Sequence, residues 1–269
     1  MPDVDGLQSD LDLITNLARE SGEIALRFFG KSPEVWMKEG ESPVSEADYA
    51  IDSFLKEKLL EARPDYGWLS EETEDTLDRV ETKRTFVVDP IDGTRGFING
   101  MKRWCVSIAI VENNRPIAGV LECPVMNETI TASAGNGTKI NGTAILSKPL
   151  KKDDTIRIAG PRSLGREFGK LVYQNSEVVP FVPSLAYRLA MISSGQIDLS
   201  LARGSAKDWD LAAADLIVHE ANASLTNIDG QQLKYNCHDI RHGTLVASNV
   251  ARHDEMLDLA RNAMDKRPN

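Results

Sequence analysis

The stretch of this sequence that is best suited to chemistry contains two aspartates, three residues apart, with a proline between them. The stretch reads Asp89-Pro90-Ile91-Asp92-Gly93-Thr94 and follows an apolar run over 85–88. Because Pro90 cannot continue a central strand, the chain is expected to turn there. Such a turn can bring Asp89, Asp92 and the Ile91 carbonyl around a hard cation, and Mg²⁺ favours oxygen ligands of this kind. Asp-Gly pairs are also common in ordinary turns, so a turn that binds nothing is the alternative.

The last two residues of the stretch point to an anion beside the cation. Gly93 lets the backbone approach a ligand closely, and the amides of Gly93 and Thr94 can open a helix. Helix starts present their free amides to phosphate groups. The stretch therefore predicts a site at which Mg²⁺ and a phosphate group meet.

Three acids elsewhere in the chain can join this site, although each has a structural alternative. Glu71 precedes Glu72 in an acidic segment, which is typical of solvated surface. Asp210 lies near the start of a helix rich in alanine and leucine, where an acid balances the helix dipole. Asp48 follows Ser45 by three residues, an arrangement that resembles a capping box with Asp in place of Glu or Gln.

The elements that must position these residues follow from the spacing of the apolar side chains. Helical spacing predicts helices over 11–28, 45–63, 184–194 and 209–221, and one more after the last strand. Runs of β-branched and aromatic residues predict strands over 85–89, 105–111, 116–121, 128–132, 155–159, 178–182, 197–201 and 243–247. The order predicts α+β structure first and α/β structure afterwards. A polar segment, Lys148–Asp154, suggests an N-terminal α+β domain over 1–150, with most candidate ligands, and a C-terminal α/β domain over 151–269, with Asp210.

The composition limits the partners of the protein. Its 269 residues include 31 Lys and Arg against 41 Asp and Glu, a formal net charge of −10. This excess argues against nucleic acid or an anionic membrane as the main partner. The N-terminus has acids where a signal peptide has Lys or Arg, and no apolar run approaches the roughly 20 residues of a membrane-spanning helix. Because the cysteines (Cys105, Cys123 and Cys237) are three and widely spaced, we expect a cytoplasmic protein with buried, reduced thiols.

Taken together, four blocks resemble the inositol monophosphatase family of metal-dependent, lithium-sensitive phosphatases. The blocks are Ser42-Pro43-Val44-Ser45-Glu46-Ala47-Asp48, Ser70-Glu71-Glu72, Asp89-Pro90-Ile91-Asp92-Gly93-Thr94 and Trp209-Asp210-Leu211-Ala212-Ala213. Their order and separations agree with the family over about Leu7 to Ala247, although Ser70 replaces a glycine, and Lys38 lies where the family often has a lysine. The resemblance implies a five-layer α-β-α-β-α sandwich of the sugar-phosphatase type, usually a homodimer.

The resemblance also implies a role for each matching residue. Two Mg²⁺ ions, or three in some members, would be held by Glu71, Asp89, Ile91 (through its carbonyl), Asp92 and Asp210. Asp89 would bridge the first two ions. The catalytic residues would be Thr94, Asp48 and Glu71, with the pair Thr94 and Asp48 positioning and activating the attacking water. Substrate contacts would come from Asp92, Gly93, Thr94, Arg203 and Asp210.

Arg203 complicates the choice of substrate. Members that favour inositol phosphate commonly carry an acid at this place, whereas a basic residue suits a second phosphate; Arg203 can equally be a surface ion-pair partner. The run Asp92-Gly93-Thr94-Arg95-Gly96-Phe97-Ile98 resembles a variant found in other phosphatases of this fold. The predicted reaction is hydrolysis of the small molecule inositol 1-phosphate. The alternatives are a 3'(2'),5'-bisphosphate nucleotidase, a histidinol-phosphate phosphatase and, from another class, a non-catalytic metal- or phosphate-binding regulator.

Other suggestive residues carry no predicted function. His219-Glu220 lacks the second histidine of a zinc-protease helix. Cys237, His238 and His242 are interpreted as loop residues, because no second cluster would complete a tetrahedral metal site. Gly135 and Gly137 are predicted to turn a hairpin.

Overall fold

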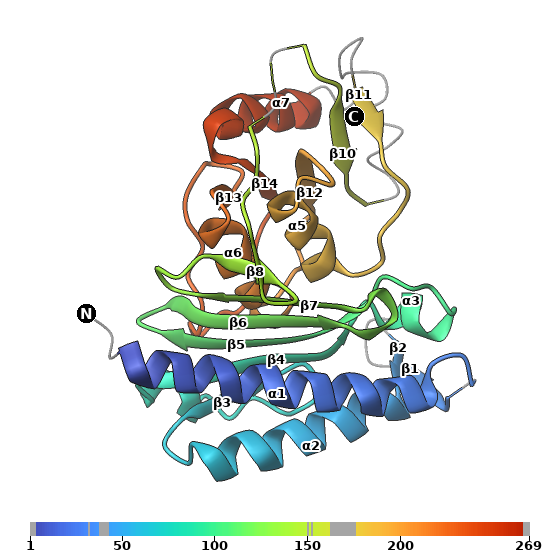
Figure 1. The fold of residues 1–269 in the computed structure, drawn as a ribbon, viewed down its shortest axis with the longest axis vertical. Helices are drawn as coiled ribbons and strands as arrows, with labels where there is room; N and C mark the ends of the chain where they lie inside the picture. The colour runs from blue at the N-terminus through green and yellow to red at the C-terminus, as the bar shows by residue number, and fades with distance from the viewer. Residues whose placement is uncertain are drawn as a thin grey trace.

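Helices and sheets alternate in five layers in the computed structural model, which describes residues 4–31, 33–37, 43–149, 151, 153–161 and 176–265 (Figure 1). The layers are the helices α1 (Val4–Phe28) and α2 (Glu46–Ala62), a seven-stranded sheet, the helices α5 (Leu185–Ser193) and α6 (Asp208–Glu220), a five-stranded sheet, and the helix α7 (His253–Asp265). The expected five-layer α-β-α-β-α sandwich is therefore confirmed. No helix within the described ranges is long and apolar enough to cross a membrane.

The seven-stranded sheet has its strands in chain order. They are β3 (Gly67–Ser70), β4 (Arg84–Asp92), β5 (Cys105–Glu112), β6 (Arg115–Cys123), β7 (Glu128–Ser133), β8 (Thr138–Ile140) and β9 (Thr143–Ile145). Only β3 and β4 pair in parallel; the other neighbours are antiparallel. Since helices cover both faces, β4, β5 and β6 are buried almost throughout, which explains their nearly continuous apolar runs.

The five-stranded sheet has the order β11-β10-β12-β14-β13. Its strands are β10 (Ile156–Ala159), β11 (Ser176–Val178), β12 (Leu199–Ala202), β13 (Ala223–Asn227) and β14 (Leu245–Asn249). Strand β10 pairs in parallel with β11 and β12, while β14 pairs antiparallel with β12 and β13. The short elements are β1 (Val35–Met37), β2 (Pro43–Ser45), α3 (Thr94–Ile98), η1 (Asp78–Glu81), η2 (Pro124–Met126) and η3 (Val250–Arg252).

Three apolar cores hold the layers together. The first joins α1 and α2 to one face of the seven-stranded sheet, and includes Ile14, Ile51 and Phe86. The second, on the other face of this sheet, extends through α5 and α6 to the five-stranded sheet. The third joins that sheet to α7. Helix α6 is thus packed between the two sheets.

Several expectations need correction. Strand β4 does not stop at Pro90 but runs to Asp92, because its pairing with β5 shifts register between Asp89 and Asp92 and the proline lies in this irregularity. The strand expected over 178–182 ends at Val178. Cys237 is partly exposed rather than buried. Lys38 lies outside the described residues, and the domain boundary near residue 150 stays a prediction.

Candidate metal and phosphate site

The register shift in β4 points two carboxylates toward one place. Asp89 pairs with Ser107 of β5 and Asp92 with Cys105, so the partner strand has one residue fewer between its two pairs. The Ile91 amide donates a hydrogen bond to Asp89 Oδ1 at 3.0 Å. A strand without this irregularity would place residues 89 and 92 on opposite faces of the sheet.

The third carboxylate comes from the first turn of α6. Asp210 Oδ2 accepts a hydrogen bond of 2.7 Å from the Lys207 amide, as the expected helix-start acid would. The carboxylate oxygens of Asp89, Asp92 and Asp210 lie within 4.8 Å of one another. Residues that are more than a hundred positions apart in the sequence therefore form one cluster.

Glu71 follows β3 and lines the same cavity as the three aspartates. The loop that carries it is fixed by Asp52 of α2: Ser70 Oγ donates to one carboxylate oxygen, and Thr73 Oγ1 donates to the other at 2.7 Å. Asp52 was not among the predicted site residues. Its signal in the sequence is its position one helical turn after Asp48, on the same face of α2.

The cluster is electrostatically strained in the absence of a cation. Burial raises the pKa of Asp89 well above its usual range, and the charges of Glu71, Asp92 and Asp210 raise it further. Burial also raises the pKa of Asp210, with Asp92 the next cause. The buried carboxylates are therefore stabilised when protons or cations bind between them. Because every donor is an oxygen, the set fits a hard ion such as Mg²⁺ rather than a soft one.

Asp92 has a second set of partners at the start of α5. Its Oδ2 accepts hydrogen bonds from Ser184 Oγ at 2.5 Å and from the Ala186 amide at 2.6 Å, and its Oδ1 accepts from the Leu185 amide at 3.2 Å. Burial raises the pKa of Asp92 to about 6, although these hydrogen bonds act in the opposite direction. Ser184, which the sequence placed only at a helix start, is therefore a direct partner of a candidate metal ligand.

Asp48 fits both interpretations that the sequence left open. Its Oδ2 accepts hydrogen bonds from the Ser45 amide at 2.8 Å and from Ser45 Oγ at 2.5 Å, which is the capping arrangement. Its Oδ1 faces Thr94, whose Oγ1 lies 3.4 Å away and also lies 3.0 Å from the Ile91 carbonyl oxygen. The Thr94 hydroxyl has one proton and therefore donates to only one of these acceptors at a time.

Gly93 joins β4 to α3, the short helix that begins at Thr94. Its φ of +95° lies in the left-handed region, and a Cβ atom there would lie 3.0 Å from the Ser184 amide nitrogen. Glycine is thus required both by the backbone conformation and by the close approach of α5. This confirms the expected turn from strand to helix.

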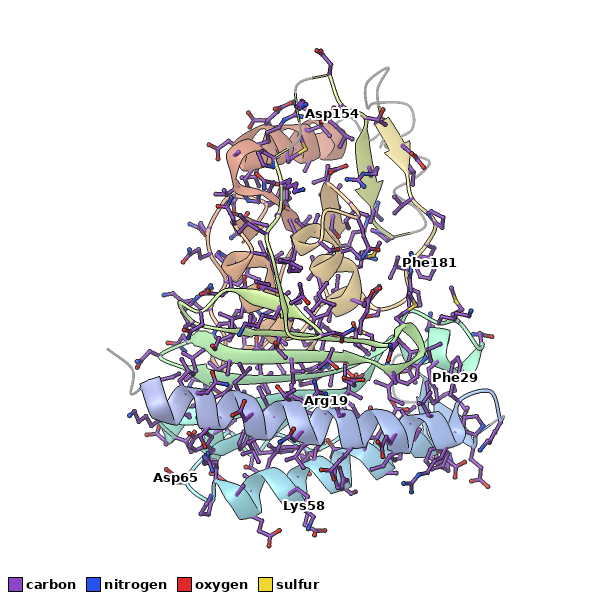
Figure 2. All side chains as sticks on the ribbon, in the orientation of Figure 1. Arg19, Phe29, Lys58, Asp65, Asp154 and Phe181 are labelled. Carbon is purple, nitrogen blue, oxygen red and sulfur yellow. The ribbon has the colours of Figure 1, made fainter. Side chains whose placement is uncertain are left out.

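A cavity of about 490 Å³ opens over these groups. Its lining includes the residues already described, namely Glu71, Asp89, Ile91, Asp92, Gly93, Thr94 and Asp210, and its remaining lining residues are Arg95, Gly96, Asn99, Met101, Phe181 and Pro183. Phe181 lies on the connection from β11 toward α5 (Figure 2). Arg203 is exposed and is not among the described residues that line the cavity, so its contact with substrate stays a prediction.

Comparison with known proteins gives a consistent result. The sequence profile of the Inositol monophosphatase family matches residues 7–265. An inositol-1-monophosphatase of Mesorhizobium japonicum is 28% identical, covering 96% of this chain and 98% of its own length. A 3'(2'),5'-bisphosphate nucleotidase CysQ of Aggregatibacter actinomycetemcomitans is 28% identical, covering 83% and 86%. The solved structure of an IMPase of Thermotoga maritima superposes with a TM-score of 0.84 at 25% identity, covering 96% and 99%.

Proposed function

Because this chain belongs to the inositol monophosphatase family, we propose that it is a Mg²⁺-dependent hydrolase of phosphate monoesters. The observation that carries the proposal is the convergence of Asp89, Asp92 and Asp210 within 4.8 Å at the base of a cavity that Glu71 also lines. The proposed ligands are Glu71, Asp89 and the Ile91 carbonyl for one ion, and Asp89, Asp92 and Asp210 for a second.

When bound, the ions would offset the charge of the phosphate group and lower the pKa of the attacking water. The protein would orient that water through the Thr94 hydroxyl, whose proton is held by Asp48. The amides of Gly93 and Thr94 would donate to phosphate oxygens. No His or Cys is present among the described residues that line the cavity, which favours direct attack by water over a covalent intermediate on such a residue.

The experiment is a phosphate-release assay on the purified chain after chelation and metal replacement. We expect activity with Mg²⁺, a fall with Ca²⁺ or Li⁺, and restoration by Mg²⁺. Thr94→Val, which removes the hydroxyl but keeps the shape, should lower kcat by at least about a hundredfold, within the range for proton-transfer groups. Turnover that is independent of metal would contradict the mechanism, and metal binding without turnover on any phosphate ester would favour the non-catalytic regulator.

Inositol 1-phosphate is the first candidate substrate, supported by the relative that bears this activity in its name and covers nearly the whole chain. A nucleoside 3',5'-bisphosphate is the second candidate, and the remaining lining residues of the cavity favour it. Phe181 and Met101 offer an apolar surface to a flat base, and Arg95 offers a cation to a second phosphate. Among the described residues, these remaining lining residues include no carboxylate, although a polyol would benefit from such acceptors.

A substrate panel separates these candidates. It compares inositol 1-phosphate, adenosine 3',5'-bisphosphate, histidinol phosphate and fructose 1,6-bisphosphate. If a second phosphate meets Arg95, Arg95→Gln should reduce kcat/KM for the bisphosphate about tenfold, the loss of one charge-assisted hydrogen bond, with less than about a twofold change for inositol 1-phosphate. Arg203→Glu makes the same comparison for the residue that the sequence pointed to. Equal losses on both substrates would assign either arginine a structural role.

Cytoplasmic location and a homodimer remain proposals.

A further inference from the structure

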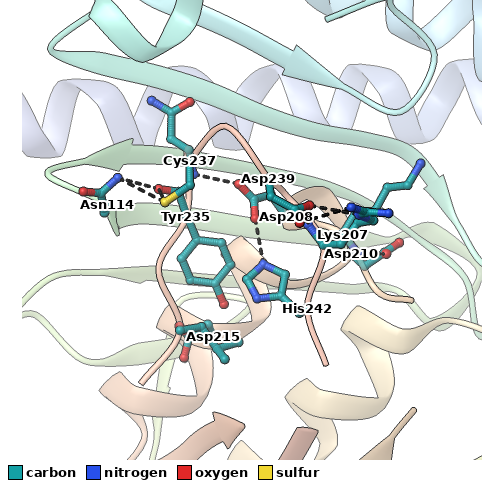
Figure 3. Close-up of polar contacts among 12 residues, drawn as sticks. Asn114, Lys207, Asp208, Asp210, Asp215, Tyr235, Cys237, Asp239 and His242 are labelled. Atoms are coloured by element: carbon teal, nitrogen blue, oxygen red, sulfur yellow. Dashed lines mark hydrogen bonds and ion pairs between the residues drawn. The ribbon is translucent and has the colours of Figure 1, made fainter. Parts of the chain in front are cut away.

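The segment Leu233–His242 lies between β13 and β14 in the chain and contacts both the seven-stranded sheet and the start of α6. We call this segment the brace. At its N-terminal end it contacts the turn between β5 and β6. The Tyr235 amide donates to the Asn114 carbonyl at 3.0 Å, and Asn114 Nδ2 donates to the Tyr235 carbonyl at 2.8 Å (Figure 3). Arg115 Nη1 donates to the Leu233 carbonyl at 2.7 Å. Main-chain atoms of the brace are therefore fixed to the seven-stranded sheet, by one main-chain and two side-chain donors or acceptors of Asn114 and Arg115.

The centre of the brace is fixed to the chain around the start of β4. Arg79 is 2% exposed and donates to Asn236 Oδ1 at 2.8 Å and to the Cys237 carbonyl at 3.1 Å. Asn236 Nδ2 donates in turn to Thr85 Oγ1 at 3.0 Å. Thr85 belongs to β4, the strand that carries Asp89 and Asp92 at its other end.

The C-terminal part of the brace holds the first turn of α6 through Asp208. This carboxylate is 0% exposed; its Oδ2 accepts from the Asn236 amide at 2.7 Å, and its Oδ1 lies 2.7 Å from His242 Nε2 (Figure 3). The His242 amide also donates to the Ala206 carbonyl at 2.8 Å, immediately before α6. Asp208 lies two residues before Asp210, on the same helix start.

These contacts connect the start of β4 to the brace, and the brace to the start of α6. Asp210 of α6 in turn lies beside Asp89 and Asp92, at the other end of β4. Asp210 is the one carboxylate of the buried cluster that does not come from β4, so its placement depends on where α6 begins. A buried carboxylate is costly unless its oxygens are satisfied. In Asp208 both oxygens have partners, and both partners are brace residues.

We propose that Asp208, held by Asn236 and His242, is a positioning residue that places Asp210 and thereby sets the affinity of the metal site. The inference rests on the proposed metal site, and it gives a role to His242, which the sequence left as a loop residue. Partners around metal ligands typically change metal affinity by about ten- to a hundredfold when removed. Because Asp208 acts through the helix rather than by touching Asp210, we expect its removal to weaken metal binding by about tenfold, the low end of this range.

The test measures Mn²⁺ binding to the metal-free full chain by electron paramagnetic resonance, which requires no turnover. Asp208→Asn should weaken Mn²⁺ binding about tenfold. In the assay, the Mg²⁺ concentration for half-maximal activity should rise by the same factor, while KM for p-nitrophenyl phosphate at saturating Mg²⁺ stays unchanged. In an Asp210→Asn background, Asp208→Asn should cause no further loss of Mn²⁺ affinity.

Asp198→Asn is the matched control. Asp198 is also a buried carboxylate, and it accepts hydrogen bonds of 2.8 Å from the Arg157 amide, Nε and Nη2 beside the five-stranded sheet. This variant should lose stability and keep its Mn²⁺ affinity. His242→Gln, which retains an N–H donor, should bind Mn²⁺ within about twofold of the native protein, whereas His242→Phe should resemble Asp208→Asn.

Native Mn²⁺ affinity in Asp208→Asn, or an equal loss in Asp198→Asn, would overturn the inference. If Asp208→Asn does not fold, the comparison of His242→Gln with His242→Phe tests the inference instead. Equal Mn²⁺ affinities in these two variants would overturn the inference. Failure of the proposed function looks different: Asp89→Asn would then leave Mn²⁺ binding unchanged.

Discussion

Asp89 is 1% exposed, and burial together with the charges of Glu71, Asp92 and Asp210 raises its pKa. At the scale of single residues, the buried carboxylates of the site therefore destabilise the metal-free fold, although their geometry suits a cation. Removing a carboxylate should relieve repulsion and remove a ligand at the same time. Activity and stability are expected to move in opposite directions.

Asp89→Asn tests this opposition. We expect phosphate release to fall below detection, because the proposed bridging ligand is lost, and the metal-free midpoint of thermal unfolding to rise above that of the native chain. Calorimetry without metal and with Mg²⁺ measures both effects, and the variant should gain little from the ion. Near-normal rates would reassign the metal site.

The pKa of Asp92 predicts a pH dependence of the metal-free protein. The folded state binds this proton with a pKa of about 6, against 3.8 for the unperturbed group. Between these values the folded state holds more protons than the unfolded chain, so stability must fall as pH rises through about 6. Denaturant unfolding in chelator at about pH 5 and about pH 7 measures the difference. Asp92→Asn is the control, and an equal decline in that variant would rule Asp92 out as the cause.

The sequence revealed site residues that lie in a local motif and missed those defined by contacts across the fold. Asp89, Asp92 and Thr94 share one short stretch, and their types indicate a cation and a phosphate. Ser184 contacts Asp92 from a position 92 residues away, and no local pattern reports such a contact. Asp52 gives only an indirect signal, its position one helical turn after Asp48 on the same face of α2.

At the scale of elements, the position of α6 depends on a glycine in β6. A Cβ atom on Gly119 would lie 3.1 Å from Ala213 Cα and 3.2 Å from the Ala213 carbonyl oxygen. The helix that carries Asp210 therefore packs directly on the backbone of the sheet. A side chain at this position would press against the backbone of α6 at Ala213.

Gly119→Ala should destabilise the fold by about 1–3 kcal/mol, as overpacking does, and weaken Mg²⁺ activation by moving Asp210. Gly243→Ala is the control, because a Cβ atom there has nothing within 4 Å. Urea unfolding and Mg²⁺ titration of activity measure the two effects. Identical behaviour of the two variants would show that the close packing of α6 on β6 is not needed.

Helices α2, α5 and α6 and the long buried strands β4, β5 and β6 were predictable from their apolar spacing, whereas β3 and β13 were not predicted and α1 begins at Val4, before the predicted start at residue 11. Helix α2 begins after Ser45, and α6 falls within one residue of expectation. Three-residue strands such as β1, β8 and β9 are too short to show an alternating pattern. The passage of β4 beyond Pro90 depends on its pairing with β5, which the sequence of β4 does not contain.

At the scale of the whole molecule, the cluster of three aspartates draws on both halves of the chain. Asp89 and Asp92 come from the seven-stranded sheet, while Asp210 comes from a helix packed between the sheets. An ion bound by all three carboxylates should stabilise both halves together. The order of elements predicted α+β and then α/β structure, and the family resemblance implied the layers, but the strand order β11-β10-β12-β14-β13 depends on crossovers that the sequence does not show.

Mg²⁺ should therefore raise the midpoint of unfolding as one transition. At about a hundred times its dissociation constant, a single bound ion contributes ~2.7 kcal/mol. Calorimetry across a Mg²⁺ titration measures the shift, and Asp210→Asn should remove most of it. A gain confined to one of two separate transitions would show that the site belongs to one half alone.

The packing of α6 between the sheets has a consequence for biosynthesis. Asp89 and Asp92 leave the ribosome well over a hundred residues before Asp210. The growing chain therefore carries an incomplete ligand set and an uncovered apolar face on its first sheet, and only the later arrival of α6 supplies both the cover and the last carboxylate. The proposed ion that Asp89, Asp92 and Asp210 share could therefore bind only after translation has passed residue 210. Products truncated before that point would present the bare sheet to chaperones and proteases, and they would lack the last ligand of that proposed ion.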